Sequence, residues 1–320
     1  MPSAEVAGRI KQIVENIEKV IVGKREAIEL AVAALLANGH VLIDDIPGVG
    51  KTSLARSLAL SVRGDFKRIQ FTPDILPSDL TGVSIWDQSR QDFTFKPGPV
   101  FANIILADEI NRATPKSQAA LLECMEERQV SVDGVSYPVP VPFMVIATEN
   151  PIEYEGTYAL PEAELDRFML RMKLGYPRPA EEVEVITRQQ RQHPIESVEA
   201  VVDTQEVAEL QRLVREVYLE DSLKEYVVRL TNATRNHPEV ELGASPRGSI
   251  TLMRLSQALA ALAARDYVIP EDIRTVAVPA LAHRLSLSPD RQLRGTSPEA
   301  IVEEILEANP APLGRRKTEA

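Results

Sequence analysis

Apolar positions recur at a helical spacing near the start of the chain and then contract into a short continuous run. Residues 5–20 place their apolar side chains on one face, which predicts an amphipathic helix: Val6, Ile10, Ile13, Ile17 and Val20. A second helix is expected over residues 24–37, because Asn38-Gly39 supplies a stop signal. The following run, residues 40–43, is short and mostly apolar, which is typical of a buried strand.

Strand-like and helix-like patterns then alternate through the first half of the chain. Four further apolar runs predict strands, at residues 67–71, 103–107, 143–147 and 168–174. Helical patterns separate them, at residues 51–63, 115–128 and 161–167. This alternation indicates an α/β fold with a mainly parallel five-stranded sheet covered by helices on both faces.

Only helical patterns follow residue 176. Six segments show the spacing, at residues 180–192, 204–218, 222–235, 246–265, 270–284 and 297–308. Start signals such as Asp203-Thr204 and Ser245-Pro246 precede them. We therefore expect an α/β core in residues 1–175, an all-helical domain in residues 176–290, and a C-terminal helix with a frayed tail in residues 291–320.

Composition narrows the class of protein. The chain has 320 residues, of which 44% are hydrophobic, and its net charge is −11. The length is typical of two domains. An acidic chain is poorly suited to general nucleic-acid binding, which depends on neutralising phosphates with Lys and Arg.

Several further classes are disfavoured by what the sequence lacks. A single cysteine, Cys124, cannot form an internal disulfide, so we expect a cytoplasmic protein. The apolar runs are shorter than the ~20 residues that span a bilayer, and no signal peptide pattern opens the chain, so membrane insertion is not expected. The four histidines are scattered without a metal-binding spacing.

The strongest chemical signal lies between the first strand and the next helix, in the string DIPGVGKT (residues 45–52). It matches the phosphate-binding loop pattern G-x-x-x-x-G-K-[ST] except that Asp45 stands at the first glycine. Gly48 and Gly50 let backbone N–H groups turn toward a phosphate, and the helix beginning near Lys51 adds its positive end. We expect Lys51 to reach the β- and γ-phosphates and Thr52 to face Mg²⁺. The rest of the nucleotide-binding set is Pro47, Val49 and Ser53.

A second motif supports the first. The apolar strand at residues 103–107 ends in two carboxylates, Asp108 and Glu109, where a buried strand delivers its last side chains to the sheet edge. We expect Asp108 to hold the Mg²⁺ shell and Glu109 to polarise the attacking water. In this order along the chain, the two motifs indicate ATP binding and hydrolysis.

Three polar residues are further candidates. Asn150 follows a predicted strand and could bind the γ-phosphate or the water, although a turn-forming Asn before Pro151 explains it equally well. Arg167 and Arg247 stand next to helix ends. They are either solvated side chains or cations that stabilise charge on the transferring phosphoryl group.

Two segments interrupt the alternating pattern. Residues 71–101 and residues 129–142 are expected to form hairpins, and Asp133-Gly134 is a strong turn signal in the second. They are either functional insertions or surface hairpins without a role.

Over residues 11–287 the chain resembles the MoxR-type AAA+ ATPases. The strings that carry the resemblance are GHVLIDDIPGVGKT, FKPGPVFANIILADEINRATPKSQAALLECMEERQVSVDG and ATENPIEYEGTYALPEAELDRFMLR. The resemblance implies a P-loop αβα core with a helical lid, ATP and Mg²⁺ as cofactors, and a homo-oligomeric hexameric ring with both hairpins near its pore.

The resemblance also assigns roles residue by residue. Lys51 and Thr52 belong to the Walker A loop, and Asp108 and Glu109 to Walker B. Asn150 matches sensor 1, Arg167 the arginine finger and Arg247 sensor 2, while Val22 before Gly23 lies against the adenine. Lys51, Arg167 and Arg247 are then expected to converge on one nucleotide between subunits.

Some positions depart from the family pattern. Asp45 is acidic where glycine is usual, and Glu149 and Tyr154 stand where Gln is expected. Arg112 and Arg171 are rivals to Arg167 as the residue that acts in trans.

The implied function is chaperone-like remodelling or maturation of client proteins, including metal-cofactor insertion, together with partners that carry a von Willebrand factor A domain. The alternatives are the ATPase subunit of a magnesium-chelatase-like complex, and a nucleic-acid motor. The nucleic-acid motor is disfavoured by the acidic net charge and by an aromatic content of 5%.

Overall fold

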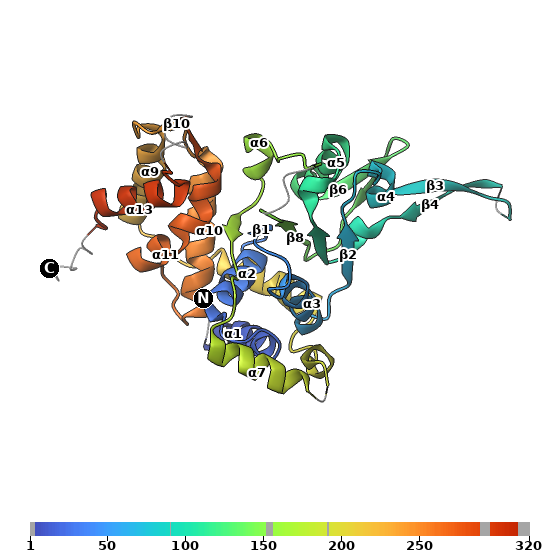
Figure 1. The fold of residues 1–320 in the computed structure, drawn as a ribbon, viewed down its shortest axis with the longest axis horizontal. Coiled ribbons are helices and arrows are strands. Elements are labelled where there is room, and N and C mark those ends of the chain that lie inside the picture. Colours follow the sequence, from blue (N-terminus) through green and yellow to red (C-terminus); the bar gives the residue numbers. More distant parts are fainter. Residues whose placement is uncertain (1–3, 90, 152–155, 191, 289–294, 313–320) are drawn as a thin grey trace.

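The computed structural model describes residues 4–89, 91–151, 156–190, 192–288 and 295–312. Tyr154 and the tail beyond residue 312 lie outside the described residues. Figure 1 shows a sheet with its covering helices on one side and a group of helices from the C-terminal half on the other. The expected division into an α/β part followed by a helical part is therefore visible in the architecture.

A five-stranded parallel sheet forms the centre of the first part. Its order is β2-β5-β8-β1-β9, and every neighbouring pair is parallel. The five predicted strands are confirmed, with the bounds Val41–Asp44 (β1), Phe66–Gln70 (β2), Ile104–Asp108 (β5), Met144–Glu149 (β8) and Leu170–Met172 (β9).

Alternate side chains of each strand face opposite layers of helices. In β5, Ile104 and Leu106 join the apolar cluster that includes α1 (Ala4–Glu18), α2 (Arg25–Leu36) and α3 (Lys51–Ser61). Ile105 and Ala107 join the cluster that includes α5 (Pro115–Glu127) and α4 (Pro77–Thr81). The sheet is thus buried on both faces, as the continuous apolar runs predict. The helix expected at residues 161–167 is shorter: α6 spans only Glu162–Leu165.

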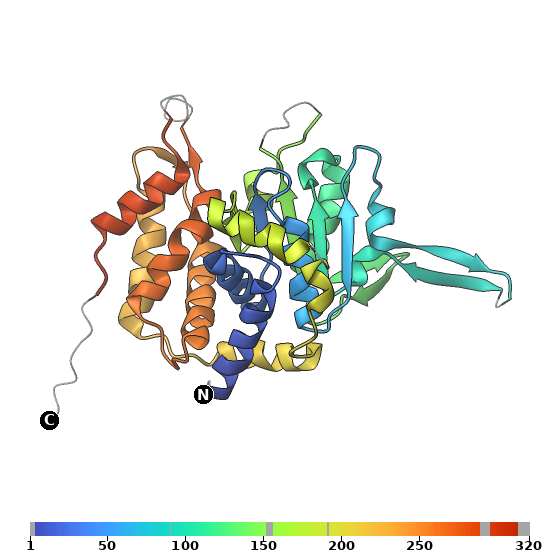
Figure 2. The ribbon, with the colours of Figure 1, turned by 60° about the horizontal axis from the view of Figure 1, so that its bottom comes forward.

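Both expected hairpins are present. The first pairs β3 (Gly82–Asp87) with β4 (Asp92–Pro97), and the second pairs β6 (Gln129–Val132) with β7 (Val135–Pro138). Asp133 and Gly134 both have positive φ, 52° and 77°, as a tight two-residue hairpin turn requires. Phe95 and Tyr137 stack at 4.1 Å between ring centroids and join the hairpins at their bases. The first hairpin projects far from the body of the molecule (Figures 1 and 2).

The C-terminal half is mainly helical. Its helices are α7 (Pro179–Gln189), α8 (Thr204–Val214), α9 (Asp221–Arg235), α10 (Pro246–Leu262), α11 (Pro270–Leu281) and α13 (Pro298–Ala308). The start signals act as expected: Asp203 Oδ1 accepts the N–H groups of Gln205 and Glu206, and Ser245 Oγ accepts that of Arg247.

One expectation is wrong, because the second domain is not all-helical. Strands β10 (Val240–Leu242) and β11 (Ser286–Leu287) pair in antiparallel fashion after the ends of α9 and of the helical turn that follows α11. They are three and two residues long, too short to produce a period-two pattern in the sequence.

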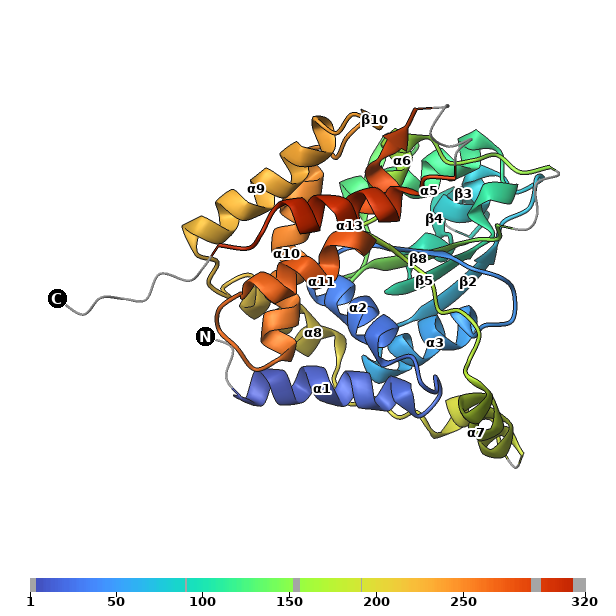
Figure 3. The ribbon, with the colours of Figure 1, turned by 60° about the vertical axis from the view of Figure 1, so that its left-hand side comes forward.

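Helix α7 stands apart from the other C-terminal helices. In Figure 3 it lies at the lower right, whereas α9 lies at the upper left. The helices α8, α9, α10, α11 and α13 instead share one apolar cluster with α1 and α2, and Gln211 Nε2 donates to the Leu35 carbonyl at 2.7 Å. Among the described residues, the structure contains no helix with the length and apolar character needed to cross a bilayer.

Candidate nucleotide-binding site

The phosphate-loop motif forms the turn between β1 and α3. Gly48 and Gly50 have φ values of 85° and 98°, a conformation that residues with a Cβ rarely adopt. Gly50 is the N-cap of α3, so the helix begins at Lys51 with its free N–H groups at the loop. The loop residues Pro47 and Val49 and the first-turn residues Thr52 and Ser53 surround this anion-binding end.

Lys51 lies among the carboxyl ends of three strands. Its Nζ donates to the carbonyl of Asp45 at 2.5 Å and to that of Glu149 at 3.4 Å. Burial lowers the pKa of the Lys51 ammonium, and the nearby carboxylates of Asp108 and Asp45 act in the opposite direction. The cation is therefore placed where a polyphosphate would replace weak carbonyl contacts with strong charge-assisted ones.

Asp108 is the last residue of β5 and Glu109 directly follows it, and the neighbouring strand β8 contacts both residues. Thr148 Oγ1 donates to Asp108 Oδ1 at 2.7 Å. Thr148 Oγ1 also accepts a hydrogen bond from the backbone N–H of Glu109 at 2.9 Å. Glu109 itself has φ of 55°, which turns the chain sharply after the strand. Thr148 thus fixes the Asp108 carboxylate relative to the backbone of Glu109.

Strand β2 contributes further contacts to the same carboxylates. Arg68 Nη2 pairs with Asp108 Oδ2 at 2.6 Å, and Gln70 Nε2 donates to Glu109 Oε2 at 2.8 Å. Arg112 also pairs with Glu109, at 2.9 Å. The Glu109 carboxylate is therefore held by an amide and a guanidinium.

Asn150 lies between the two motifs in the sheet order. It directly follows β8, which pairs with β5 on one side and β1 on the other. Its side chain is buried in this position. The preceding Glu149 is also largely buried, and burial raises the pKa of its carboxyl group while Arg171 opposes the shift.

The linker before α2 forms another wall. A Cβ on Gly50 would meet Ile21 Cδ1 at 3.4 Å, so the linker touches the phosphate loop. Val22 is buried, and Gly23 has φ of 72°. A Cβ on Gly23 would meet the Glu181 carboxyl carbon at 2.1 Å, which places α7 directly over this linker.

Asp45 has a structural role that glycine could not fill. Its Oδ2 accepts the N–H groups of Leu174 and Gly175 at 2.7 and 2.6 Å, and its Oδ1 accepts that of Ile46 at 2.8 Å. The side chain is 7% exposed. Asp45 therefore ties the start of the phosphate loop to the segment that leaves β9 toward α7.

The donor atoms at this edge fit Mg²⁺. Thr52 supplies a hydroxyl and Asp108 a carboxylate, both hard oxygen donors. In the described part of the chain, no group of three or more His, Cys, Asp or Glu could hold a metal by itself. Mg²⁺ in phosphoryl-transfer sites is held by one or two protein oxygens together with phosphate oxygens, so this pair is sufficient.

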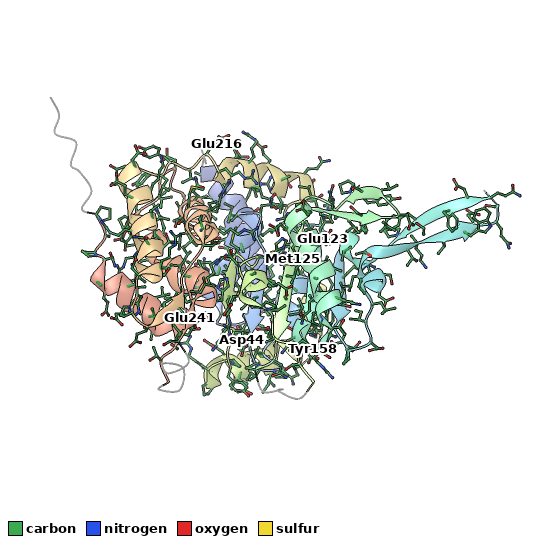
Figure 4. The ribbon with its side chains drawn as sticks, turned by 90° about the horizontal axis from the view of Figure 1, so that it is seen from above. Asp44, Glu123, Met125, Tyr158, Glu216 and Glu241 are labelled. Carbon is green, nitrogen blue, oxygen red and sulfur yellow. The ribbon has the colours of Figure 1, made fainter. Side chains whose placement is uncertain are left out.

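Arg167 and Arg247 lie at the opposite edge of the sheet. Arg167 precedes β9, and because β9 is parallel to β1 this is the edge where β1 begins. Arg167 Nε is 3.3 Å from Glu126 Oε2, and Arg247 pairs with Oε1 of the same carboxylate. In Figure 4, Asp44 at the carboxyl end of β1 lies on the lower side, whereas Met125, next to Glu126, lies further up.

Asp166 brings these two arginines together. Its Oδ1 accepts from Arg284 Nε at 2.8 Å, and its Oδ2 accepts from Ser245 Oγ at 2.9 Å. The Arg284 side chain is 2% exposed. Because Asp166 directly precedes Arg167 and contacts Ser245 at the start of α10, it holds the start of α10 beside Arg167.

Arg112 and Arg171, the two alternatives to Arg167, form ion pairs at the other edge of the sheet. Arg112 pairs with Glu109, and Arg171 pairs with Asp44, so both contact carboxylates at the carboxyl edge of their own subunit. Their guanidinium groups are therefore not presented at the edge that carries Arg167.

Several residues of the site were missed in the sequence. Thr148 had a usable signal, since it directly follows the predicted strand at residues 143–147 and stands two residues before Asn150. Arg68 and Gln70 had none, because their role depends on β2 being the neighbour of β5. Asp166 and Glu126 also depend on how the C-terminal helices pack.

Two family models match the chain. One is described as an ATPase family associated with various cellular activities (AAA) and matches residues 40–170. The other is an AAA lid domain and matches residues 232–305.

Known relatives cover nearly the whole chain. YeaC of Bacillus subtilis, a protein described as uncharacterised, is 54% identical over 94% of each chain. Chaperone MoxR1 of Mycobacterium tuberculosis is 41% identical over 93% of this chain and 81% of its own. A crystal structure from Cytophaga hutchinsonii, provisionally described as an ATPase, has 40% identity and a TM-score of 0.91, covering 98% of this chain and 97% of its own.

Magnesium-chelatase subunits are more distant. The ChlI subunit of Nicotiana tabacum is 31% identical over 61% of this chain and 46% of its own.

The role of Asp45 can be tested by restoring the glycine of the general motif. We expect Asp45→Gly to lower the free energy of unfolding by on the order of 3 kcal/mol, because three N–H groups lose their acceptor. Asp45→Asn keeps one acceptor oxygen and should lose less. Urea denaturation of the nucleotide-free proteins measures both, and equal stability of Asp45→Gly and the wild type would contradict the assignment.

Proposed function

The chain belongs to the MoxR family of AAA+ ATPases, and from that premise we propose that it acts as a hexameric, cytoplasmic ring that remodels client proteins. Hydrolysis of ATP is the activity of the family. The observation that carries the proposal is that each subunit has its phosphate loop at one edge of a parallel sheet, and Arg167 and Arg247, paired with one carboxylate, at the opposite edge.

At the carboxyl edge, the chain's own residues bind the nucleotide and direct the water. Lys51 and the N-terminus of α3 hold the phosphates, and Thr52 and Asp108 hold Mg²⁺, which neutralises charge on the phosphate oxygens when bound. Glu109 accepts a proton from the attacking water, and Asn150 aligns that water or the γ-phosphate. Val22 and Gly23 contact the adenine.

At the amino edge, Arg167 and Arg247 act on the nucleotide of the next subunit. Guanidinium groups supplied in trans stabilise the transition state in GTPases by roughly 10³–10⁵ in rate, or about 4–7 kcal/mol. A subunit cannot deliver these cations to its own phosphate loop across the sheet. Hydrolysis therefore requires assembly.

Glu126 holds both arginines in a single subunit. Its two oxygens pair with Arg167 and Arg247, much as the phosphate of a neighbouring subunit would. We propose that contact with the neighbouring nucleotide replaces this carboxylate, so that the arginine pair is positioned in advance.

The output of the ring is movement of a client protein. The β3–β4 hairpin carries Trp86 and Phe93, whose rings lie 5.2 Å apart while 53% and 65% exposed. Exposed aromatic side chains at the end of a projecting element are suited to contact with another protein. We propose that this hairpin contacts a client or a partner with a von Willebrand factor A domain. The shorter coverage by magnesium-chelatase subunits makes that complex the second candidate.

The first prediction separates nucleotide binding from hydrolysis. Lys51→Ala should lose ATP binding, because the main cation of the loop is removed. Glu109→Gln should bind ATP normally and lose on the order of 10²–10⁴ in turnover. Binding calorimetry and phosphate release measure the two effects, and unchanged ATP affinity in Lys51→Ala would disprove the loop assignment.

The second prediction tests action in trans. Arg167→Ala should bind ATP and assemble, yet lose roughly 10³ in turnover. Mixing it with Lys51→Ala should restore activity at roughly a quarter of the interfaces, where an intact loop meets an intact arginine edge. If the mixture stays as inactive as its components, Arg167 acts within its own subunit or has no catalytic role.

The third prediction concerns the client. Trp86→Ala combined with Phe93→Ala should leave basal ATP turnover unchanged, because the hairpin tip is far from the nucleotide. The same variant should lose ATP-dependent co-purification with a tagged von Willebrand factor A domain partner. Ser84→Ala in the same hairpin is the matched control, and retained co-purification by the double variant would exclude the tip as the contact.

A further inference from the structure

Helix α7 exposes an apolar face bordered by an acid. Val183 and Ile186 are three residues apart and are 65% and 66% exposed, and Glu182 is on the same face, four residues before Ile186. Among the described residues, Glu182 has no ion-pair partner. Because only Glu181 of this helix is buried, most of the surface of α7 is accessible for contact with another molecule.

Helix α10 carries a stripe of the opposite charge, which is exposed at Arg247 and Ile250 and half-buried at Arg254. Arg247, Ile250 and Arg254 are spaced by three and then four residues, so they line one face. Ile250 is 54% exposed. Burial and the nearby Arg215 lower the pKa of Arg254. In the part of the chain that the structure describes, neither Arg254 nor Arg215 pairs with a carboxylate.

We propose that α7 of one subunit docks on the α10 stripe of the next subunit, with Ile250 between Val183 and Ile186 and with Arg254 facing Glu182. This inference rests on the proposed action of Arg247 in trans and adds the surfaces that hold the two subunits together. The two surfaces are complementary. Helix α7 offers an acidic residue beside two apolar ones, and α10 offers an apolar residue between two basic ones.

The position of α7 near the phosphate loop indicates that the partner of its exposed face is a second copy of this chain. Glu181 packs over Gly23 at the adenine end of the site, and Lys24 Nζ donates to the Tyr176 carbonyl at 2.7 Å. Helix α7 would therefore lie beside a nucleotide bound at the proposed site. Arg247 is the first stripe residue of α10, so a subunit that reaches the nucleotide with Arg247 brings Ile250 and Arg254 toward α7.

The contact is heterologous, which gives a sharp test. Val183→Glu combined with Ile186→Glu damages only the α7 surface, and Ile250→Glu damages only the α10 surface. Each variant alone should bind ATP with wild-type affinity, remain monomeric in sedimentation experiments and lose ATP turnover. Val228→Glu is the matched control, since Val228 is 55% exposed on α9, and it should assemble normally.

Mixing the two defective variants should restore one interface. The intact α7 of Ile250→Glu meets the intact α10 of the other variant, and both remaining surfaces are blocked. We expect a one-to-one dimer and a rise in turnover of on the order of tenfold or more over either protein alone. A mixture that stays monomeric and inactive overturns the proposal.

A charge exchange tests the register independently. Glu182→Arg and Arg254→Glu should each weaken assembly, and the double variant should recover it. If the double variant assembles no better than the single variants, Glu182 and Arg254 do not face each other across the interface. If the α7 variants assemble normally while the Arg167 mixture recovers activity, the docking is wrong and the proposed function stands. Failure of the Arg167 mixture removes the proposed function itself.

Discussion

The parallel direction of β9 and β1 is the constraint on which the rest of this molecule depends. Because the strands run the same way, the residue before β9 and the loop after β1 lie at opposite edges of the sheet. Strands rise by about 3.3 Å per residue, so β1 alone separates the edges by more than 10 Å. Lys51 and Arg167 therefore extend from opposite edges of the sheet, and in the proposed function they act on the nucleotides of different subunits.

Buried polar contacts make each edge rigid. Asp45 joins the phosphate loop to the chain that leaves β9, and Thr148 ties the Asp108 carboxylate to the backbone of Glu109 at the end of β5. At the other edge, Asp166 holds α10 in place through Arg284 and Ser245. As a result, Arg247 of α10 lies beside Arg167, although the two residues are far apart in the sequence. The proposed head-to-tail ring would bring this arginine edge of one subunit to the phosphate-loop edge of the next.

The parts that the sequence predicts are those encoded by local strings. The loop from Gly48 to Thr52, the five strands and the Asp133-Gly134 hairpin each follow from neighbouring residues. Gln70 and Arg68 depend on the order of strands, which no local pattern specifies. The sharing of Glu126 by Arg167 and Arg247 depends on the packing of α10, and β10 and β11 are too short to leave a pattern.

The central claim is that the catalytic site is shared between subunits. ATP turnover per subunit, measured over protein concentrations that span assembly as followed by sedimentation, tests it most directly. We predict that turnover is close to zero for the monomer and rises in step with the assembled fraction. A constant turnover per subunit, already present in the monomer, would contradict the account.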